Sequence, residues 1–179
     1  EWRRRVHQWP ELGFEEERTA ALVESVLKEL DCSVHTGVGR TGVVTELGQG
    51  SSVVALRADM DALPIEEATG LSFACRRPGL MHACGHDAHV GMLLGAATIL
   101  SGQVLNGTVR LLFQPSEEGA DADGLSGAAR MIEDGAMEGV QAIFGLHVNP
   151  ELPTGAIGVR AGAIPAAADS LTVPVTRQG

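Results

Sequence analysis

The sequence has 179 residues, of which 44% are hydrophobic and 20% charged, the composition of a globular domain with its own core. Its net charge of -10 disfavours nucleic-acid binding, because 13 lysines and arginines against 23 acidic residues cannot easily build a basic face. No apolar run approaches the roughly 20 residues of a membrane span. Three cysteines, Cys32, Cys75 and Cys84, form no CxxC pair, which indicates a reducing compartment. We therefore expect a cytoplasmic protein without a nucleic-acid or membrane partner.

The predicted elements alternate between helices and strands. Residues 14–30 repeat an apolar residue every three or four positions, which predicts an amphipathic helix. Residues 41–47 and 52–58 are two β-rich runs around a short glycine turn and predict a hairpin. The later predicted elements are a helix over about 87–100, a strand over 107–113, a helix over about 127–134 and a strand over 142–148. This alternation predicts an α/β domain with a largely parallel central sheet.

Reactive side chains follow three of the predicted strands. Asp59 and Asp61 follow the strand at 52–58, and Glu117 and Glu118 follow the strand at 107–113. His147 lies at the end of the strand at 142–148. In open α/β sheets, ligands bind beyond the carboxyl ends of the strands. We therefore expect these side chains to converge on one edge of the sheet.

The segment at residues 82–87 joins a thiol to two imidazoles just before a predicted helix. In a loop that leads into a helix, Cys84 and His86 can turn toward one ion, since thiolate and imidazole are common metal ligands. The neighbouring Asp87 is a candidate partner for a ligating imidazole. The alternative interpretation is a buried free cysteine beside surface histidines.

The adjacent carboxylates of Glu117 and Glu118 allow a division of roles. One can bind a metal ion while the other faces the substrate as a general base. A solvated acidic loop is the alternative interpretation of this pair. His147 taken alone would be a hydrogen-bonded core residue, but the two neighbouring clusters favour a ligand.

For five side chains the surrounding sequence gives weaker evidence of a role in the site. Asp59 and Asp61 flank a methionine at the end of a strand, where they would face the same way, and a simple turn is the alternative. His7, His35 and His89 carry no comparable context, so we predict that they are structural or surface residues.

Five stretches of the sequence, in order, resemble the M20 metallopeptidase family and more closely its amidohydrolase branch. That branch includes hippurate hydrolases, N-acyl-amino-acid deacylases (aminoacylases), N-acetyldiaminopimelate deacetylases and plant auxin-conjugate hydrolases. The stretches are HQWPELGFE at 7–15, RADMDALPI at 57–65, MHACGHDAHVGMLLGAA at 81–97, FQPSEEG at 113–119 and GLHVNP at 145–150.

The resemblance implies a site for two divalent metal ions, manganese or zinc, with nickel or cobalt as alternatives. The implied metal ligands are Cys84, His86, Glu118 and His147. Glu117 matches the general base, and Asp61 matches the catalytic acid that orients the site. Other branches carry a histidine where this chain has Asp59; we expect His86 to replace it and assign no role to Asp59.

The fold implied by the resemblance is a three-layer α/β/α zinc-peptidase-like catalytic domain. Residues 1–168 match its N-terminal part. Residues 169–179, which include a β-like run over 170–176, match the first strand of an inserted α+β lid and dimerisation domain. We expect the chain to stop where this lid starts, since the family's enzymes are about twice as long, and the full-length protein to be a homodimer.

The implied function is hydrolysis of the amide bond in small N-acylated amino acids, such as hippurate or N-acetyl-amino acids. A metal-activated water would attack, with Glu117 as general base. Three alternatives remain: a metal-binding but inactive fragment, a dipeptidase or carboxypeptidase of the same family, and a cysteine hydrolase. In the last, Cys84 would be the nucleophile and His86 or His82 its base.

Overall fold

The computed structural model describes residues 1–162, and the chain divides into two units at residues 148 and 149. The helices are α1 (Trp2–Gln8), α2 (Glu17–Glu29), α3 (His86–Ser101) and α4 (Gly127–Glu133). The strands are β1 (Val34–Val38), β2 (Gly42–Gly48), β3 (Val53–Asp59), β4 (Thr108–Gln114) and β5 (Val140–Gly145). All of these elements belong to the first unit. The strand predicted at 170–176 and the boundary predicted at 168/169 lie outside the described residues.

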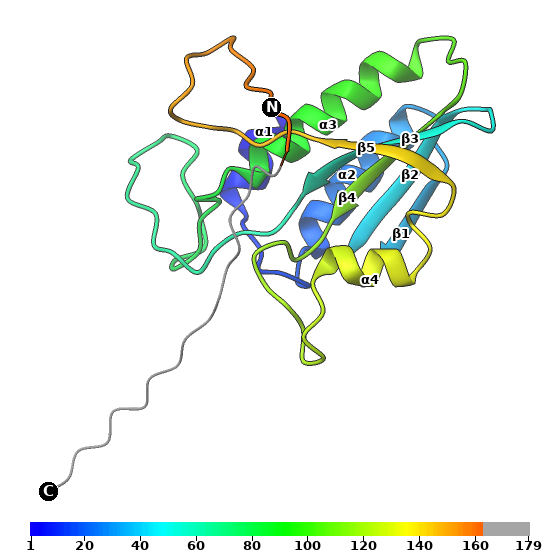
Figure 1. The fold of residues 1–179 in the computed structure, drawn as a ribbon. Coiled ribbons are helices and arrows are strands. Elements are labelled where there is room, and N and C mark those ends of the chain that lie inside the picture. The colour runs from blue at the N-terminus through cyan, green and yellow to red at the C-terminus, as the bar shows by residue number, and fades with distance from the viewer. Residues whose placement is uncertain (163–179) are drawn as a thin grey trace, which may run out of the picture. The chain divides into compact units, whose positions relative to one another are not determined.

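The five strands form one mixed sheet in the order β1-β2-β4-β3-β5 (Figure 1). β3 runs parallel to both of its neighbours, β4 and β5, whereas β2 is antiparallel to β1 and β4. The predicted parallel arrangement therefore holds for the three strands that carry the predicted site. Because these strands are parallel, their carboxyl ends meet at the same edge of the sheet.

The predicted hairpin between residues 41–47 and 52–58 is wrong, because β4 lies between β2 and β3. β4 pairs with β2 on one side and with β3 on the other, and its consecutive side chains Leu111, Leu112 and Phe113 are buried, as is typical of a strand inside a sheet that is covered on both faces. The hairpin forms instead between β1 and β2. Its turn contains Gly39 and Arg40, both with positive φ, as tight hairpin turns require.

The predicted three-layer α/β/α arrangement is confirmed. α2 and α3 pack on one face of the sheet, and α4 packs on the opposite face (Figure 1). The first interface buries Val23 and Leu27 of α2 and Leu94 of α3 against Leu111 and Phe113. The second interface is smaller and is built around Met131, Val44 and Leu112. Among the described residues, no helix is both long and apolar enough to cross a membrane.

α2 begins three residues later than its apolar pattern predicts. Phe14 has a φ of 64°, a left-handed conformation that a helix cannot contain. The buried Glu11 side chain then accepts hydrogen bonds from the backbone N–H groups of Arg18 and Thr19, both at 2.9 Å. These bonds satisfy donors that the first helical turn leaves free, so Glu11 fixes where the helix starts.

Substituting Leu111→Ala is expected to lower the free energy of unfolding by about 2–5 kcal/mol, because the side chain is fully buried between the sheet and the helices. Urea titration of both proteins measures the difference. Val104 is 97% exposed, so the control Val104→Ala should change stability by less than about 0.5 kcal/mol. Equal effects of the two substitutions would contradict this description of the core.

Candidate metal centre

The predicted convergence at the edge of the sheet is present around the imidazole of His86. Its Nε2 atom lies 3.6 Å from Oδ2 of Asp59, the last residue of β3. The same atom lies 3.8 Å from Glu117 Oε2 and 3.8 Å from Glu118 Oε1, which follow β4. Glu118 is the less exposed of the pair, at 27% against 43%. His86 therefore lies among three carboxylates that come from two neighbouring strands.

Cys84 and His147 meet next to this cluster. The Sγ atom of Cys84 lies 3.3 Å from His147 Nε2, although 63 positions separate the two residues in the chain. Potential ligand atoms of Cys84, His86 and His147 all lie within 4.8 Å of one another, as do those of His86, Glu117 and Glu118. The structure thus brings together all four residues predicted as ligands and the predicted general base.

Gly85 allows Cys84 and His147 to lie close to each other. Its φ of 85° turns the chain into α3, a backbone conformation that residues with a Cβ rarely adopt. A Cβ at this position would lie 2.4 Å from Val148 Cγ2. A glycine between Cys84 and His86 therefore lets the segment around His147 approach the start of α3.

Asp61 fixes the orientation of two other site residues. Nδ1 of His86 lies 2.9 Å from the main-chain oxygen of Asp61 and 3.2 Å from its Oδ1. The Oδ2 atom of Asp61 accepts a hydrogen bond from the backbone N–H of Glu118 at 2.9 Å. Burial alone would raise the pKa of Asp61, but the bonds from His86 and from the backbone lower it, so the group is a carboxylate. Asp61 therefore holds the imidazole of His86 and the backbone of Glu118 next to each other.

Asp59, which had no predicted role, pairs with Arg57 and His89. Its Oδ2 accepts from Arg57 Nη1 at 2.6 Å, and its Oδ1 lies 2.6 Å from His89 Nδ1. Burial opposes the charge, yet these partners lower the pKa of Asp59 to about 2. His89 is buried in α3, and its Nε2 accepts a hydrogen bond from the backbone N–H of Val148 at 3.0 Å. His89 is therefore part of the site, which sequence reasoning missed.

A signal for His89 was available in the sequence. Side chains three positions apart lie on the same face of a helix, so His89 follows His86 on one face of the predicted helix.

The other two histidines without sequence context differ from each other. His35 is exposed on β1, as predicted. His7 is buried in α1, with Nδ1 2.9 Å from Asp87 Oδ2 and Nε2 3.3 Å from Glu67 Oε1. Asp87 was a candidate partner for a metal-binding imidazole because of its position in the sequence. In the structure it connects α3 to α1 through His7 instead. Asp61, a residue of another segment, takes that role for His86.

The loop before Glu117 is held from the N-terminal segment. Ser116 has a φ of 39°, and its backbone N–H donates to the buried carboxyl of Glu16 at 2.8 Å. Burial raises the pKa of Glu16, against opposing hydrogen bonds from Thr41 and Ser116. A Cβ on Gly13 would lie 2.4 Å from Ser116 Oγ. The segment at residues 13–16, at the end of the first motif, therefore supports the turn that presents Glu117.

The donor set fits divalent metal ions. The Nε2 atom of His86 is buried and has no hydrogen-bond partner among residues 1–162, while carboxylate oxygens surround it. Burial disfavours a charge on His86, yet Asp61 and Asp59 raise its pKa. Burial also raises the pKa of Cys84 to about 12, and the carboxylates of Glu118 and Glu117 add to this shift. A cation would offset this excess of negative charge and use the free imidazole nitrogen.

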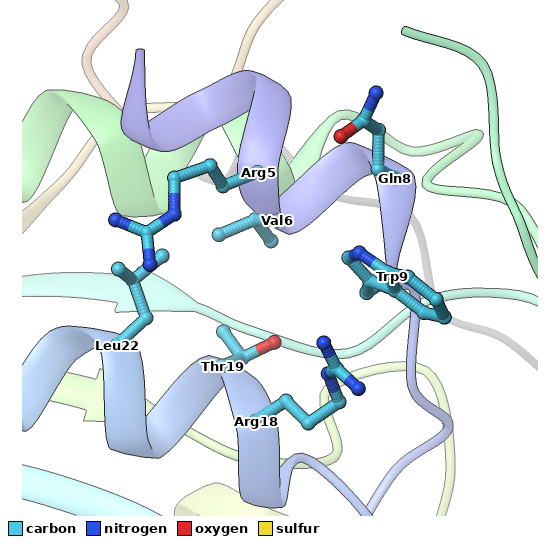
Figure 2. A pocket seen from close by; sticks show the side chains of 7 residues that line it. All are labelled: Arg5, Val6, Gln8, Trp9, Arg18, Thr19 and Leu22. Carbon is cyan, nitrogen blue, oxygen red and sulfur yellow. The ribbon is translucent and has the colours of Figure 1, made fainter.

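A separate cavity of about 290 Å³ lies between α1 and α2 (Figure 2). The residues that line it are Arg5, Val6, Gln8, Trp9, Arg18, Thr19 and Leu22. The guanidinium of Arg18 lies 4.2 Å from the ring centre of Trp9. Cysteine, histidine and carboxylate side chains are all missing from this lining, so the cavity is unrelated to the metal centre.

Comparison with known proteins identifies a family and two informative relatives. The sequence profile described as peptidase family M20/M25/M40 matches residues 55–177. An N-acetyl-L-cysteine deacetylase of Bacillus subtilis is 44% identical over 181 residues, which cover 99% of this chain and 42% of the relative. An IAA-amino acid hydrolase of Arabidopsis thaliana is 47% identical over 180 residues, which cover 99% of this chain and 40% of the relative.

One solved structure has the same fold over the described domain. It is a Bacillus subtilis protein described as a dinuclear metal binding peptidase from the M20 family. The TM-score is 0.84 at 43% sequence identity, and the match covers 90% of this chain and 45% of that one. The chain thus spans less than half the length of each of these relatives.

The metal-free protein is expected to lose stability between about pH 6.5 and pH 4 because of His82. Burial lowers the pKa of this imidazole to about 4, and neither ring nitrogen has a hydrogen-bond partner among the described residues. The unfolded chain protonates the same group near pH 6.5, so in this window the unfolded state binds the extra proton and is favoured.

His82→Gln should therefore flatten the pH dependence of the free energy of unfolding by at most about 1.4 kcal/mol per pH unit in this window, as measured by urea titration. The control is His35→Gln, which removes an exposed histidine. Equal flattening in both variants, or none in His82→Gln, would show that His82 is not the group responsible.

Proposed function

The chain belongs to peptidase family M20/M25/M40, and on that basis we propose that it is part of a metal-dependent hydrolase that cleaves the amide bond of N-acyl amino acids. The observation that carries the proposal is the cluster around His86. Its thiol, imidazole and carboxylate atoms form groups within 4.8 Å at the carboxyl ends of parallel strands. Activity is assigned to the full-length protein, because the chain spans less than half of its relatives.

The substrate class is supported by the relatives. One is named a deacetylase of N-acetyl-L-cysteine and the other a hydrolase of an IAA-amino acid, so both names refer to amino acid conjugates. We extend this class to the present protein: a small amino acid whose nitrogen carries an acyl group. Hippurate and N-acetyl-amino acids are two members of the class to be tested.

We propose Cys84, His86, Glu118 and His147 as ligands of a centre for two divalent ions. Thiolate, imidazole and carboxylate together suit manganese or zinc, with nickel or cobalt as alternatives. When bound, such ions lower the pKa of a coordinated water to about 7 and polarise the amide carbonyl. The neighbouring structure described as dinuclear supports the number of ions.

Glu117 acts as the general base in this proposal. Its carboxylate is the more exposed of the acidic pair and still reaches within 3.8 Å of His86 Nε2, so it borders both the centre and the solvent-facing side. Glu117 accepts a proton from the attacking water as the water oxygen bonds to the amide carbon. When the C–N bond breaks, Glu117 donates that proton to the leaving amine. Asp61 keeps His86 and Glu118 in place throughout.

The rival mechanism with Cys84 as nucleophile has less support. A nucleophilic cysteine needs a lowered pKa, whereas burial and two carboxylates raise the pKa of Cys84 to about 12. Of the two candidate bases, His82 is buried, and its pKa of about 4 makes it a weak base. His86 is hydrogen-bonded to Asp61 through Nδ1, and its Nε2 lies 3.8 Å from carboxylate oxygens of Glu117 and Glu118. A thiol mechanism also leaves the acidic pair without a function.

The remaining features of the proposal concern organisation. We propose residues 1–168 as part of the catalytic domain and residues 169–179 as the start of a lid and dimerisation domain, with a homodimer as the full-length form. A cytoplasmic location is supported by Cys32, Cys75 and Cys84, which are free thiols in the structure.

Glu117→Gln in the full-length protein is expected to lower kcat about 10²–10⁴-fold, because the amide cannot accept the proton. Metal content measured by elemental analysis should stay unchanged. Glu118→Gln should instead reduce the metal content, since it removes a proposed ligand. The exposed Glu29→Gln serves as the matched control and should behave like the wild type. Undiminished turnover in Glu117→Gln would exclude it as the base.

Removal of metal with a chelator is expected to abolish release of free amino acids from a panel of N-acetyl- and N-benzoyl-amino acids, and added manganese or zinc should restore it. Dipeptides in the same panel separate an amidohydrolase from a dipeptidase or carboxypeptidase. Parallel assays of residues 1–179 decide whether this part alone is an inactive metal-binding fragment. Hydrolysis that persists after complete removal of metal would favour the cysteine mechanism.

A further inference from the structure

His89 uses both ring nitrogens within the protein. Its Nδ1 lies 2.6 Å from Asp59 Oδ1, and its Nε2 lies 3.0 Å from the backbone nitrogen of Val148. Asp59 is paired with Arg57 and is ionised, so it can only accept, and Nδ1 of His89 must carry the hydrogen. A backbone N–H can only donate, so Nε2 of His89 must present its lone pair to Val148. These two bonds fix one neutral tautomer of His89.

The fixed tautomer bears on metal binding. Ligand atoms of Asp59, His86 and His89 lie within 4.8 Å of one another, which by distance alone makes them a candidate metal group. However, a ligating imidazole needs a free lone pair, and the lone pair of His89 Nε2 already accepts the hydrogen of Val148. His86 differs, because its Nε2 has no hydrogen-bond partner among the described residues.

His89 also contacts the proposed ligand His147. The two rings lie edge to face, with centroids 4.7 Å apart and planes at 72°. Val148, whose N–H is bound by His89, directly follows His147, and His147 Nδ1 lies 2.7 Å from the carbonyl oxygen of Val148. His147 is exposed and belongs to a segment without helix or strand. The bond to His89 joins this segment to α3.

We propose that His89 is a positioning residue and not a metal ligand: held by Asp59, it fixes the backbone at Val148 and thereby aims His147 at the metal centre. This inference rests on the proposed function, since it takes His147 as a ligand. It also assigns the role of Asp59, which pairs through Arg57 with Gln114 at the end of β4. The pairing of carboxylate, imidazole and backbone N–H thus connects β3, α3 and the segment after β5.

Two substitutions of His89 separate its two bonds. In His89→Asn, the side-chain NH₂ can replace the Nδ1 donor, whereas in His89→Gln the side-chain oxygen can replace the Nε2 acceptor. Cobalt(II) is the probe, added to the full-length protein and followed by calorimetry and by the absorption of the Cys84 thiolate–cobalt bond. We expect His89→Asn to weaken one of the two cobalt sites about ten- to hundredfold, and His89→Gln to stay within about threefold of the wild type.

The matched control is Leu93→Ala, which removes a buried side chain one turn further along α3. It should lower the melting temperature and leave cobalt affinity unchanged. Equal weakening by His89→Asn and His89→Gln would indicate a lost ligand and overturn the proposal. It is also overturned if His89→Asn binds like the wild type, or if Leu93→Ala weakens cobalt as strongly. A wild-type protein that binds no cobalt would overturn the proposed function itself.

Discussion

Hydrogen bonds between two carboxylates at the end of β3 and two imidazoles at the start of α3 organise the whole site. Asp61 binds His86 and Asp59 binds His89, and all four side chains are buried. Buried charges are costly unless they are paired, so each carboxylate and imidazole constrains the other's position. Because β3 is flanked by β4 and β5, these two pairs set the point toward which the acidic pair and His147 are directed.

Two residues next to these pairs have positive φ angles, which residues with a Cβ rarely adopt. Gly85 starts α3 in a left-handed conformation, and Ser116 adopts a positive φ immediately before Glu117. Ser116 lacks the conformational freedom of a glycine, and it is held by Glu16, a buried carboxyl from 100 positions earlier in the chain. Such conformations cost free energy and persist where the surroundings fix them. The N-terminal segment thus contributes to the site without supplying a ligand.

The fold class and the side chains that converge could be predicted from the sequence, because each strand is followed directly in the chain by reactive residues. It was insufficient where the information is nonlocal. The pattern of β2 and β3 contains no sign that β4, about 50 positions later, pairs with both. His89 and His7 look like ordinary helical residues until Asp59 and Asp87 are placed beside them. Tertiary packing likewise decides that Asp61, and not the neighbouring Asp87, hydrogen-bonds His86.

The protonated sulfur of Cys84 has a consequence for how the centre is filled. Because the thiol pKa is raised to about 12 in the metal-free protein, a cation that binds Sγ must displace a proton into solvent. Loading is therefore an exchange of a proton for a metal ion, and acid opposes it. Before loading, the same protonation keeps the sulfur slow toward peroxide and alkylating agents, since only the thiolate reacts readily. Burial, together with the carboxylates of Glu118 and Glu117, thus disfavours the reactive thiolate form of Cys84 until a metal ion is bound.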